Sequence, residues 1–538
     1  MNYLLFPGRH LVNTVFQDTY LRRVLSTPPA ELPGVLPGRA SPASPPTGII
    51  FAITSANQEN SRFNPIPFHV RAIGVDRFAR DLRQRADFHF RVFGIPHYGH
   101  TRSFAAFTVK EIANQSEQRI ELTPENCLVL CSTPEVVRIY RELGFAIAPA
   151  ESAEPEPRPA TPLEIIREIG AHSPDWQSRP LVTSNLAPSH RSLFEDMPEI
   201  PQRIARLYQD PLTNQEGSLT ATRNYSTYAR GMNEIIRLKY LDIRGGIRPG
   251  RVVDEGCADG ALLAEISRNF PDSDLFGIDL SAEFAGRFHE RQRAGEFGGA
   301  YVHFFHRNLL DHIFERDSID TTICNSTLHE LWSYAEQEKT VRGYLAEKLR
   351  QLRSGGRLII RDVVGPEGAD REILLGCSDG DGMNPDPADL GRHAGREAEW
   401  LRQLSTRSRF HLFARDFLGG NRPFPHRDTV HDGRPFVRLT LRQAAEFLSK
   451  KDYTDNWKAE MNEEFCFWDF AAWKAVLAEI GFQVRENPNN PTQGSRVYTN
   501  PWIVQNRYET HVVLLDPDGH SLPWPPTNMV LVAEKPQR

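Results

Sequence analysis

The segment 251–263, RVVDEGCADGALL, places acidic and small residues at the end of an apolar run. Asp254 and Glu255 close this run, which has the pattern of a buried strand. Small residues follow at alternate positions and let a ligand approach the backbone closely: Gly256, Ala258 and Gly260. Such a turn can hold a phosphate, but two acids repel a pyrophosphate and attract an ammonium or a sulfonium group.

Strand-like and helix-like runs alternate around this turn and must position it. Strands are expected at 252–256, 275–281, 301–311 (with a loop), 319–326 and 357–364, and helices at 261–270, 282–295 and 334–352. The alternation predicts half of a doubly wound parallel sheet, in which the carboxyl ends of the strands meet at one edge.

The segment from Gly365 to Met461 breaks this alternation. It is rich in Asp, Gly, Arg and His, and we expect an insertion that covers the carboxyl edge of the sheet. The pattern resumes with a helix, FWDFAAWKAVLAEIGF, a short strand, FQV, and a last strand, NMVLVAEK.

Five segments, in order along the chain, resemble the motifs of class I S-adenosylmethionine-dependent methyltransferases: VVDEGCADG, FGIDLS, HRNLLD, IDTTICNSTLHEL and NMVLVAEK. The resemblance covers residues 220–538. It implies a seven-stranded sheet closed by an antiparallel hairpin, with S-adenosylmethionine as the cofactor.

The same resemblance implies a role for each residue of the turn. Asp254 would lie near the amino-acid moiety of the cofactor, and the turn of Gly256, Ala258 and Gly260 would wrap that moiety. Ala258 departs from the strict G-x-G-x-G pattern.

Further residues would contact the nucleoside. Asp279, next to Leu280, would accept hydrogen bonds from the ribose hydroxyls, as a strand-end acid can. Asn308, next to Leu309, would contact the adenine amino group. Asn325 ends the strand that would line the mouth between cofactor and acceptor.

NSTLHELWSY (325–334) resembles the H-[DN]-W-S-D segment of small-molecule O-methyltransferases, although Leu331 interrupts the match. The resemblance implies His329 as general base, and imidazole has a suitable pKa for that role. Glu330 would be a second catalytic carboxylate. The alternatives are a structural histidine at the start of the next helix and a solvated acid in its first turn.

The main rival for this half is a nicotinamide-dependent oxidoreductase, which also uses a glycine turn and a strand-end acid. Dinucleotide binding requires G-x-G-x-x-G, one residue longer than the spacing here. The rival also gives no account of the closing hairpin.

Three other segments suggest further contacts. Tyr225, Tyr228 and Arg230 would form a lid over the cofactor. The segment SRVYTNPWIVQNRYE (495–509) could line an acceptor pocket or simply pack the hairpin. The polar residues of the insertion fit a solvated loop better than a metal site, and no metal is expected: His393, Asp416, His426, Asp428, His431 and Asp432.

The first 170 residues also alternate, with strands at 2–6, 48–53 and 127–132 and a helix at 70–84. LLFPGRHLVNTVFQDTYLRR resembles the nucleotidyltransferase fold typified by nicotinamide-mononucleotide adenylyltransferases. Thr14 and Gln17 stand where that family has its two phosphate-binding histidines. Charge stabilisation would then rest on arginines, namely Arg9, Arg62, Arg71 or Arg167.

Composition limits the remaining choices. A chain of 538 residues is too long for one ordinary core, and 40% hydrophobic with 25% charged residues is typical of a globular protein. The net charge of −6 gives no sign of a general nucleic-acid or membrane-surface binder. Six scattered cysteines predict buried, reduced thiols and a cytoplasmic protein, and no apolar run is long enough to span a membrane.

We therefore expect an α/β protein with two Rossmann-like domains. Residues 1–205 would form a nucleotidyltransferase-like domain, with a nucleotide as a partner, and residues 206–538 a methyltransferase domain with an insertion at about 365–461. The acceptor would be a small molecule or a nucleotide-linked metabolite, with transfer to oxygen preferred. A bifunctional nucleotidyltransferase–methyltransferase and a non-catalytic nucleotide- or cofactor-binding protein are the alternatives.

Overall fold

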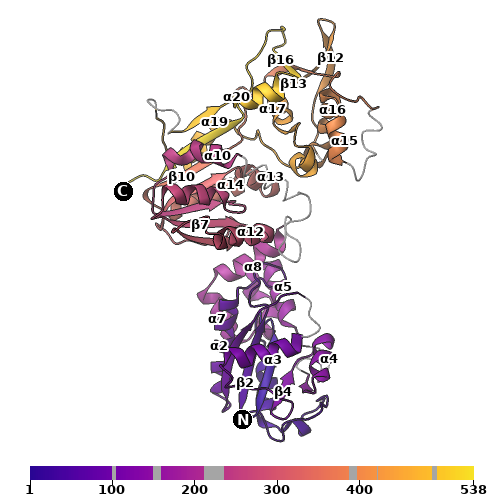
Figure 1. Ribbon diagram of the computed structural model, residues 1–538, viewed down its shortest axis with the longest axis vertical. Helices are drawn as coiled ribbons and strands as arrows, with labels where there is room; N and C mark the ends of the chain where they lie inside the picture. The colour runs from indigo at the N-terminus through magenta and orange to yellow at the C-terminus, as the bar shows by residue number, and fades with distance from the viewer. Residues whose placement is uncertain are drawn as a thin grey trace. The chain divides into compact units, whose positions relative to one another are not determined.

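The computed structural model describes residues 1–99, 104–149, 159–210, 235–386, 397–420, 422–487 and 494–537 (Figure 1). The chain divides into two compact units, Met1–Ser218 and Leu219–Arg538. None of the helices in these ranges has the length and apolar character needed to cross a membrane. All six cysteines are buried free thiols.

The first unit contains a parallel sheet with the strand order β3-β2-β1-β4-β5. Its strands are β1 (Tyr3–Gly8), β2 (Gly48–Thr54), β3 (His89–Ile95), β4 (Cys127–Leu130) and β5 (Ala146–Ala148). Helices α1 (Val15–Ser26), α2 (Phe68–Arg83), α3 (Phe104–Gln115) and α4 (Pro134–Glu142) accompany them. The order reverses between β1 and β4, as in a Rossmann-like sheet. Strand β3 was not among the predicted strands.

Four helices complete this unit: α5 (Pro162–His172), α6 (Pro180–Asn185), α7 (Pro188–Asp196) and α8 (Glu199–Gln209). Their apolar side chains form a separate buried cluster around Ile166, Leu193 and Ile204.

The sheet of the second unit has the order β14-β17-β10-β9-β6-β7-β8. Its strands are β6 (Arg251–Glu255), β7 (Asp274–Asp279), β8 (Tyr301–His306), β9 (Ile319–Asn325), β10 (Leu352–Asp362), β14 (Gln483–Val484) and β17 (Asn528–Glu534). β17 runs antiparallel to both β10 and β14, whereas the pairs from β8 to β10 are parallel. The predicted α/β class and the antiparallel closure are confirmed, and these seven strands form the continuous path of the sheet. An eighth, short strand, β15 (Arg496–Tyr498), also pairs with β17.

Helices cover both faces of this sheet. On one face α14 (Gln337–Gln351) and α19 (Phe470–Ile480) pack against Leu358 and Ile360. On the other face Ile359 meets α10 (Ile236–Ile243), α11 (Ala261–Asn269) and α12 (Ala282–Arg293). The alternation of successive β10 residues between the two cores is that of a strand buried on both sides.

The insertion is a folded subdomain, and the stretch HRDTVHD within it, predicted as a solvated loop, is part of a hairpin. Its antiparallel sheet has the order β12-β13-β11-β16, in which β16 comes from outside the predicted insertion (Figure 1). The strands are β11 (Glu372–Cys377), β12 (Arg427–His431), β13 (Arg434–Thr440) and β16 (Val512–Leu515), with α15 (Glu397–Gln403), α16 (Thr406–Asp416), α17 (Leu441–Lys450) and α18 (Trp457–Met461). Phe410, Phe413 and Phe447 lie in its own buried core.

The stretch HRDTVHDGRPF forms the hairpin of β12 and β13. Asp432 and Gly433 turn the chain with φ values of +48° and +73°. Two successive positive φ angles, supplied by Asp-Gly, are typical of a tight two-residue hairpin turn. No residue of β12 is buried, so the polar side chains of this stretch lie on an exposed edge strand.

A buried ion pair joins β6 to α14. Lys348 Nζ donates to Glu255 Oε1 at 2.6 Å, and the Tyr344 hydroxyl donates to Glu255 Oε2. All three side chains are at most 2% exposed. Glu255 thus points into the protein core, so the inference that it attracts a cationic ligand is corrected: its charge is already neutralised by Lys348.

Replacing Lys348 with Met should destabilise the second unit by about 3–5 kcal/mol, because it leaves the Glu255 carboxylate buried and unpaired. Seven of the eight tryptophans belong to Leu219–Arg538, so their fluorescence during urea unfolding reports on this unit. Lys339→Met, which breaks an exposed pair on the same helix, is the matched control and should change the midpoint little. Equal shifts for the two variants would contradict the structural role of Lys348.

Candidate active site

The turn after β6 is tied to β7 by its own backbone. Gly256 and Cys257 both donate N–H groups to the Ile278 carbonyl, at 2.9 and 3.1 Å. The Ala258 N–H donates to Asp279 Oδ2 at 2.9 Å. Three successive N–H groups therefore already have acceptors, whereas a phosphate-binding turn directs such groups at its ligand.

The two glycines of the turn are required by packing within the protein. Gly256 and Gly260 have φ values of +75° and +81°. A Cβ at Gly256 would lie 2.4 Å from Thr327 Oγ1, and one at Gly260 would lie 2.5 Å from the Phe288 ring. The sequence argument invoked close approach of a cofactor, but close approach of Thr327 and Phe288 suffices to explain these glycines. Ala258 adopts φ +47° without being glycine.

Asp254, the last acid before the turn, is almost fully buried. Its Oδ2 has no hydrogen-bond partner within the described part of the chain. Burial raises the pKa of Asp254 to about 7, opposed by the charge of the buried Lys239 on α10 and assisted by Asp279 and Glu255. A buried carboxylate oxygen without a donor fits the ammonium group of an amino-acid ligand.

Asp279 ends β7 beside the turn, as predicted, and is half-buried. Its carboxylate accepts from Ala258 N and from Ser281 N, the latter at 2.8 Å. Burial raises the pKa of Asp279 to about 6, against these backbone hydrogen bonds, and Glu330 contributes in the same direction as burial. Each oxygen keeps a second lone pair, so ribose hydroxyls can still bind there.

The other predicted cofactor contacts surround the same edge. Leu280 follows Asp279, and its carbonyl accepts from His306 Nε2 at 2.9 Å. Asn308 Oδ1 accepts from Leu310 N at 2.9 Å, and Leu309 packs against the core. Asn325 is buried at the end of β9. Tyr225, Tyr228 and Arg230, the predicted lid residues, lie outside the described residues, as does His393.

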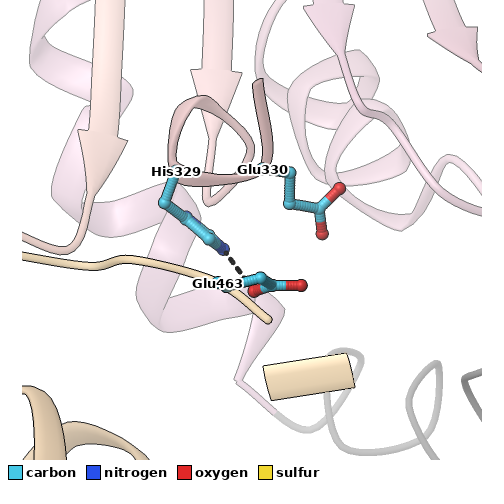
Figure 2. Close-up of side chains that lie close together, drawn as sticks. All are labelled: His329, Glu330 and Glu463. Carbon is cyan, nitrogen blue, oxygen red and sulfur yellow. Dashed lines mark ion pairs between the residues drawn. The ribbon is translucent and has the colours of Figure 1, made fainter. Parts of the chain in front are cut away.

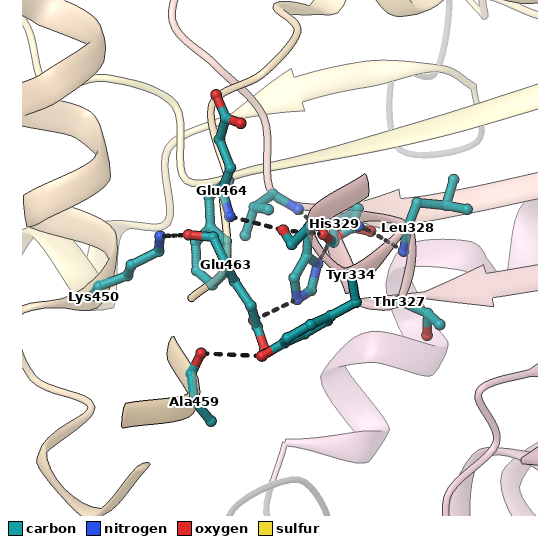
Figure 3. Close-up of polar contacts among 12 residues, drawn as sticks. Thr327, Leu328, His329, Tyr334, Lys450, Ala459, Glu463 and Glu464 are labelled. Atoms are coloured by element: carbon teal, nitrogen blue, oxygen red, sulfur yellow. Dashed lines mark hydrogen bonds and ion pairs between the residues drawn. The ribbon is translucent and has the colours of Figure 1, made fainter. Parts of the chain in front are cut away.

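His329 lies in the first turn of α13 (Leu328–Tyr334), between two carboxylates (Figure 3). Its Nδ1 is 2.6 Å from Asp362 Oδ1, and its Nε2 is 3.5 Å from Glu463 Oε2. Burial opposes the imidazolium, but the charges of Asp362 and Glu463 and the hydrogen bond to Asp362 outweigh it and raise the pKa of His329 well above its ordinary value.

Glu330 is half-buried and follows His329 in the chain. Figure 2 shows the side chains of His329, Glu330 and Glu463 close together. Their potential ligand atoms lie within 4.8 Å of one another. Glu463 belongs to the segment after α18, where the insertion returns to the sheet. The predicted catalytic pair therefore meets a side chain from the insertion.

The end of the insertion is attached to α13 by several contacts. Trp332 Nε1 donates to Glu464 Oε2 at 2.9 Å, and its ring stacks on Phe467 at 4.2 Å. The Glu464 N–H donates to Ser333 Oγ at 2.8 Å. The Tyr334 hydroxyl lies 3.3 Å from Glu463 Oε1. These contacts hold the insertion against the helix that carries His329.

Three residues of this site were not found from the sequence: Lys239, Asp362 and Glu463. Asp362 is the acid at the end of RLIIRDVV, a position that strand-end reasoning could have identified. Lys239 and Glu463 have no such signal, because they come from a helix and a segment far from the motifs.

The proposed acceptor-pocket residues of 495–509 are brought together only in part. The Tyr498 hydroxyl donates to Asp242 Oδ2 at 2.7 Å, and Asn500 caps the short helix α20 (Pro501–Ile503). Trp502 is exposed, with the Arg507 guanidinium 5.6 Å from the centre of its ring, and its carbonyl accepts from Asn506 Nδ2 at 2.8 Å. None of the described His and Asp residues that the sequence singled out in the insertion belongs to a cluster of three potential metal ligands: Asp416, His426, Asp428, His431 and Asp432.

The glycine turn, the strand-end acids and the strand order define a class I methyltransferase domain. Residues 252–356 match the family model described as a methyltransferase domain. The second unit therefore contains an S-adenosylmethionine-dependent methyltransferase domain, with S-adenosylmethionine as its cofactor, as predicted.

Solved structures of low identity resemble the chain. A Listeria monocytogenes protein assigned as an S-adenosylmethionine-dependent methyltransferase is 14% identical, with 57% of this chain and 100% of that chain covered and a TM-score of 0.29. An S-adenosylmethionine-dependent methyltransferase from Mesorhizobium loti is 14% identical, with 56% and 98% covered and a TM-score of 0.30. The YcgJ protein of Bacillus subtilis is 13% identical, with 58% and 100% covered and a TM-score of 0.27. A search of curated proteins found no match.

The affinity for S-adenosylhomocysteine should increase from about pH 6 to about pH 8, by up to about tenfold per pH unit below pH 7. Asp254, with its pKa near 7, must lose a proton before it pairs with the ligand ammonium. The buried Lys239, whose pKa burial lowers to about 7, loses its repulsive charge over the same range, so both groups act in one direction.

Isothermal titration at several pH values measures this dependence. Asp254→Asn should flatten it, while Asp272→Asn, at an exposed acid of the same domain, should leave it intact. A wild-type affinity that is constant from pH 6 to pH 8 would exclude the contact between Asp254 and the ammonium.

Proposed function

We propose that this methyltransferase acts on a hydroxyl oxygen of a small-molecule or nucleotide-linked acceptor. The observation that carries the proposal is the buried Asp362–His329 contact of 2.6 Å beside Glu330, at the carboxyl edge of the sheet. When bound, S-adenosylmethionine supplies an electrophilic methyl group on a sulfonium. The protein has to align the acceptor, exclude water and remove the hydroxyl proton.

The cofactor contacts are part of the proposal. Asp254 would hold the ammonium, the turn of Gly256, Ala258 and Gly260 would enclose the amino-acid moiety, and Asp279 with Leu280 would hold the ribose. Asn308, Leu309 and Asn325 would contact the adenine and line the mouth toward the acceptor. The burial of Asp254 and the backbone hydrogen bonds that orient Asp279 support these assignments.

Proton removal is assigned to Glu330 together with His329. His329 can accept a proton at Nε2 only after it has lost the proton that Asp362 and Glu463 stabilise. Glu330 is less buried than His329, and its charge contributes to the raised pKa of Asp279. In this arrangement Glu330 receives the acceptor proton, and His329 orients and polarises the site.

A role of the first unit in nucleotidyl transfer gains no support from its side chains. Thr14 and Gln17 form the capping box of α1. Arg9, Arg62 and Arg71 each donate to main-chain carbonyls, and Arg71 is almost fully buried. We propose that this unit is a binding module without transferase activity.

The full chain should therefore release no pyrophosphate when it is incubated with ATP or CTP. Release of pyrophosphate above background would restore the bifunctional alternative.

Glu330→Gln should lower methyl transfer by about 10²–10⁴-fold, the usual contribution of a proton acceptor, and leave the affinity for S-adenosylhomocysteine largely unchanged. The assay follows labelled methyl from S-adenosylmethionine into a metabolite extract, with the product identified by mass spectrometry. Glu336→Gln, at an exposed acid nearby, is the matched control. Full activity of Glu330→Gln would remove the proton-acceptor role, and an N-methylated product would exclude the preference for oxygen.

A further inference from the structure

Three potential ligands from two distant segments converge beside α13 (Figure 2). His329 and Glu330 come from the first turn of this helix, and Glu463 comes from the end of the insertion. Glu463 is fully buried and His329 almost so. An imidazole nitrogen and two carboxylates at one place form a mixed ligand set that transition-metal ions prefer.

The spacing of His329 and Glu463 fits two ligands on one ion. Their Nε2 and Oε2 atoms are 3.5 Å apart, which is beyond the distance of a good hydrogen bond. Two ligands at about 2.1 Å from a tetrahedral ion would be separated by about 3.4 Å. On the other side of the ring, Nδ1 makes a direct hydrogen bond of 2.6 Å to Asp362.

The contacts behind the ligands are those of a metal-binding histidine. Such a histidine donates its second ring N–H to a carboxylate, which fixes the ring orientation. Asp362 occupies this place and is itself held by the Leu328 N–H at 2.8 Å. Glu463 is fixed through its carbonyl by Lys450, whose ammonium also pairs with Glu446 at 2.8 Å (Figure 3).

The charges also favour a cation. Asp362, Glu330 and Glu463 surround one imidazole, so negative charge exceeds positive charge even when His329 is protonated. We propose that His329 Nε2, Glu330 and Glu463 bind one divalent transition-metal ion such as Zn²⁺, with the remaining coordination positions open. Binding would displace the Nε2 proton of His329 into solvent.

The consequence for catalysis rests on the proposed function, whereas metal binding itself does not. An acceptor hydroxyl at an open position would lose its proton more readily, as water does on zinc. One Glu330 oxygen would bind the ion, and the other would remain to receive that proton. The sequence predicted no metal, because His329 and Glu330 were given catalytic roles and Glu463 lies far from them along the chain.

Equilibrium dialysis of the chelator-treated full chain against Zn²⁺, with metal counted per chain, tests the proposal. We expect one tight Zn²⁺ per wild-type chain. Loss of a residue that merely supports a metal ligand lowers metal affinity by about 10–100-fold. Glu463→Gln removes a ligand and should lower the Zn²⁺ affinity by at least as much. His520→Ala is the matched control, because Asp516, Asp518 and His520 form the other candidate cluster among described residues, on an exposed loop.

Two results would overturn the proposal: no difference in Zn²⁺ binding between the wild type and Glu463→Gln, or loss of the tight site in His520→Ala. Because Glu463 is fully buried, Glu330→Gln at a half-buried position serves as a second variant if Glu463→Gln does not fold. Titration with S-adenosylhomocysteine is measured in parallel. If the wild type binds S-adenosylhomocysteine but no tight Zn²⁺, the proposed metal site alone is wrong. If it binds Zn²⁺ tightly but not S-adenosylhomocysteine, the proposed function alone is wrong.

Discussion

The arrangement of the candidate active site depends on the contacts made by the Asp362 carboxylate. It lies at the end of β10, is 1% exposed, and accepts from the backbone of Leu328 and Val363 and from the His329 ring. One buried group thereby fixes the start of α13, the orientation of an imidazole and the exit of the chain into the insertion. Burial disfavours its charge, but His329 and these N–H donors outweigh burial and lower the pKa of Asp362.

The sequence correctly predicted the elements whose conformation is determined by a local residue pattern. The turn at Gly256–Gly260 and the strand-end Asp279 occupy the predicted positions, because a buried strand followed by small residues has few alternative conformations. The seven-stranded order was available only through the resemblance. Side-chain partners that join distant segments were not predictable, and Glu463 reaches His329 only because the insertion folds back.

The errors in the insertion have one physical origin. HRDTVHDGRPF was interpreted by its polar composition, although Asp432-Gly433 is the residue pair of a tight hairpin turn. β12, which carries most of these polar residues, is an edge strand with no buried side chain, so polar residues are expected there. The prediction for Glu255 also relied on its place in the sequence, because its position next to a ligand-binding turn suggested a ligand contact. Its side chain points the other way, as alternation along β6 requires.

The position of β17 in the sheet has a consequence for synthesis on the ribosome. This strand pairs with β10, β14 and β15, yet it is synthesised after every other described strand of its sheet. Residues 363–527 emerge between β10 and β17, which takes on the order of ten seconds. During that time the nascent β10 presents an unpaired apolar edge, the kind of surface that invites aggregation. All described strands of the parallel sheet come from within Met1–Ser218, so this sheet can close long before the methyltransferase sheet is complete.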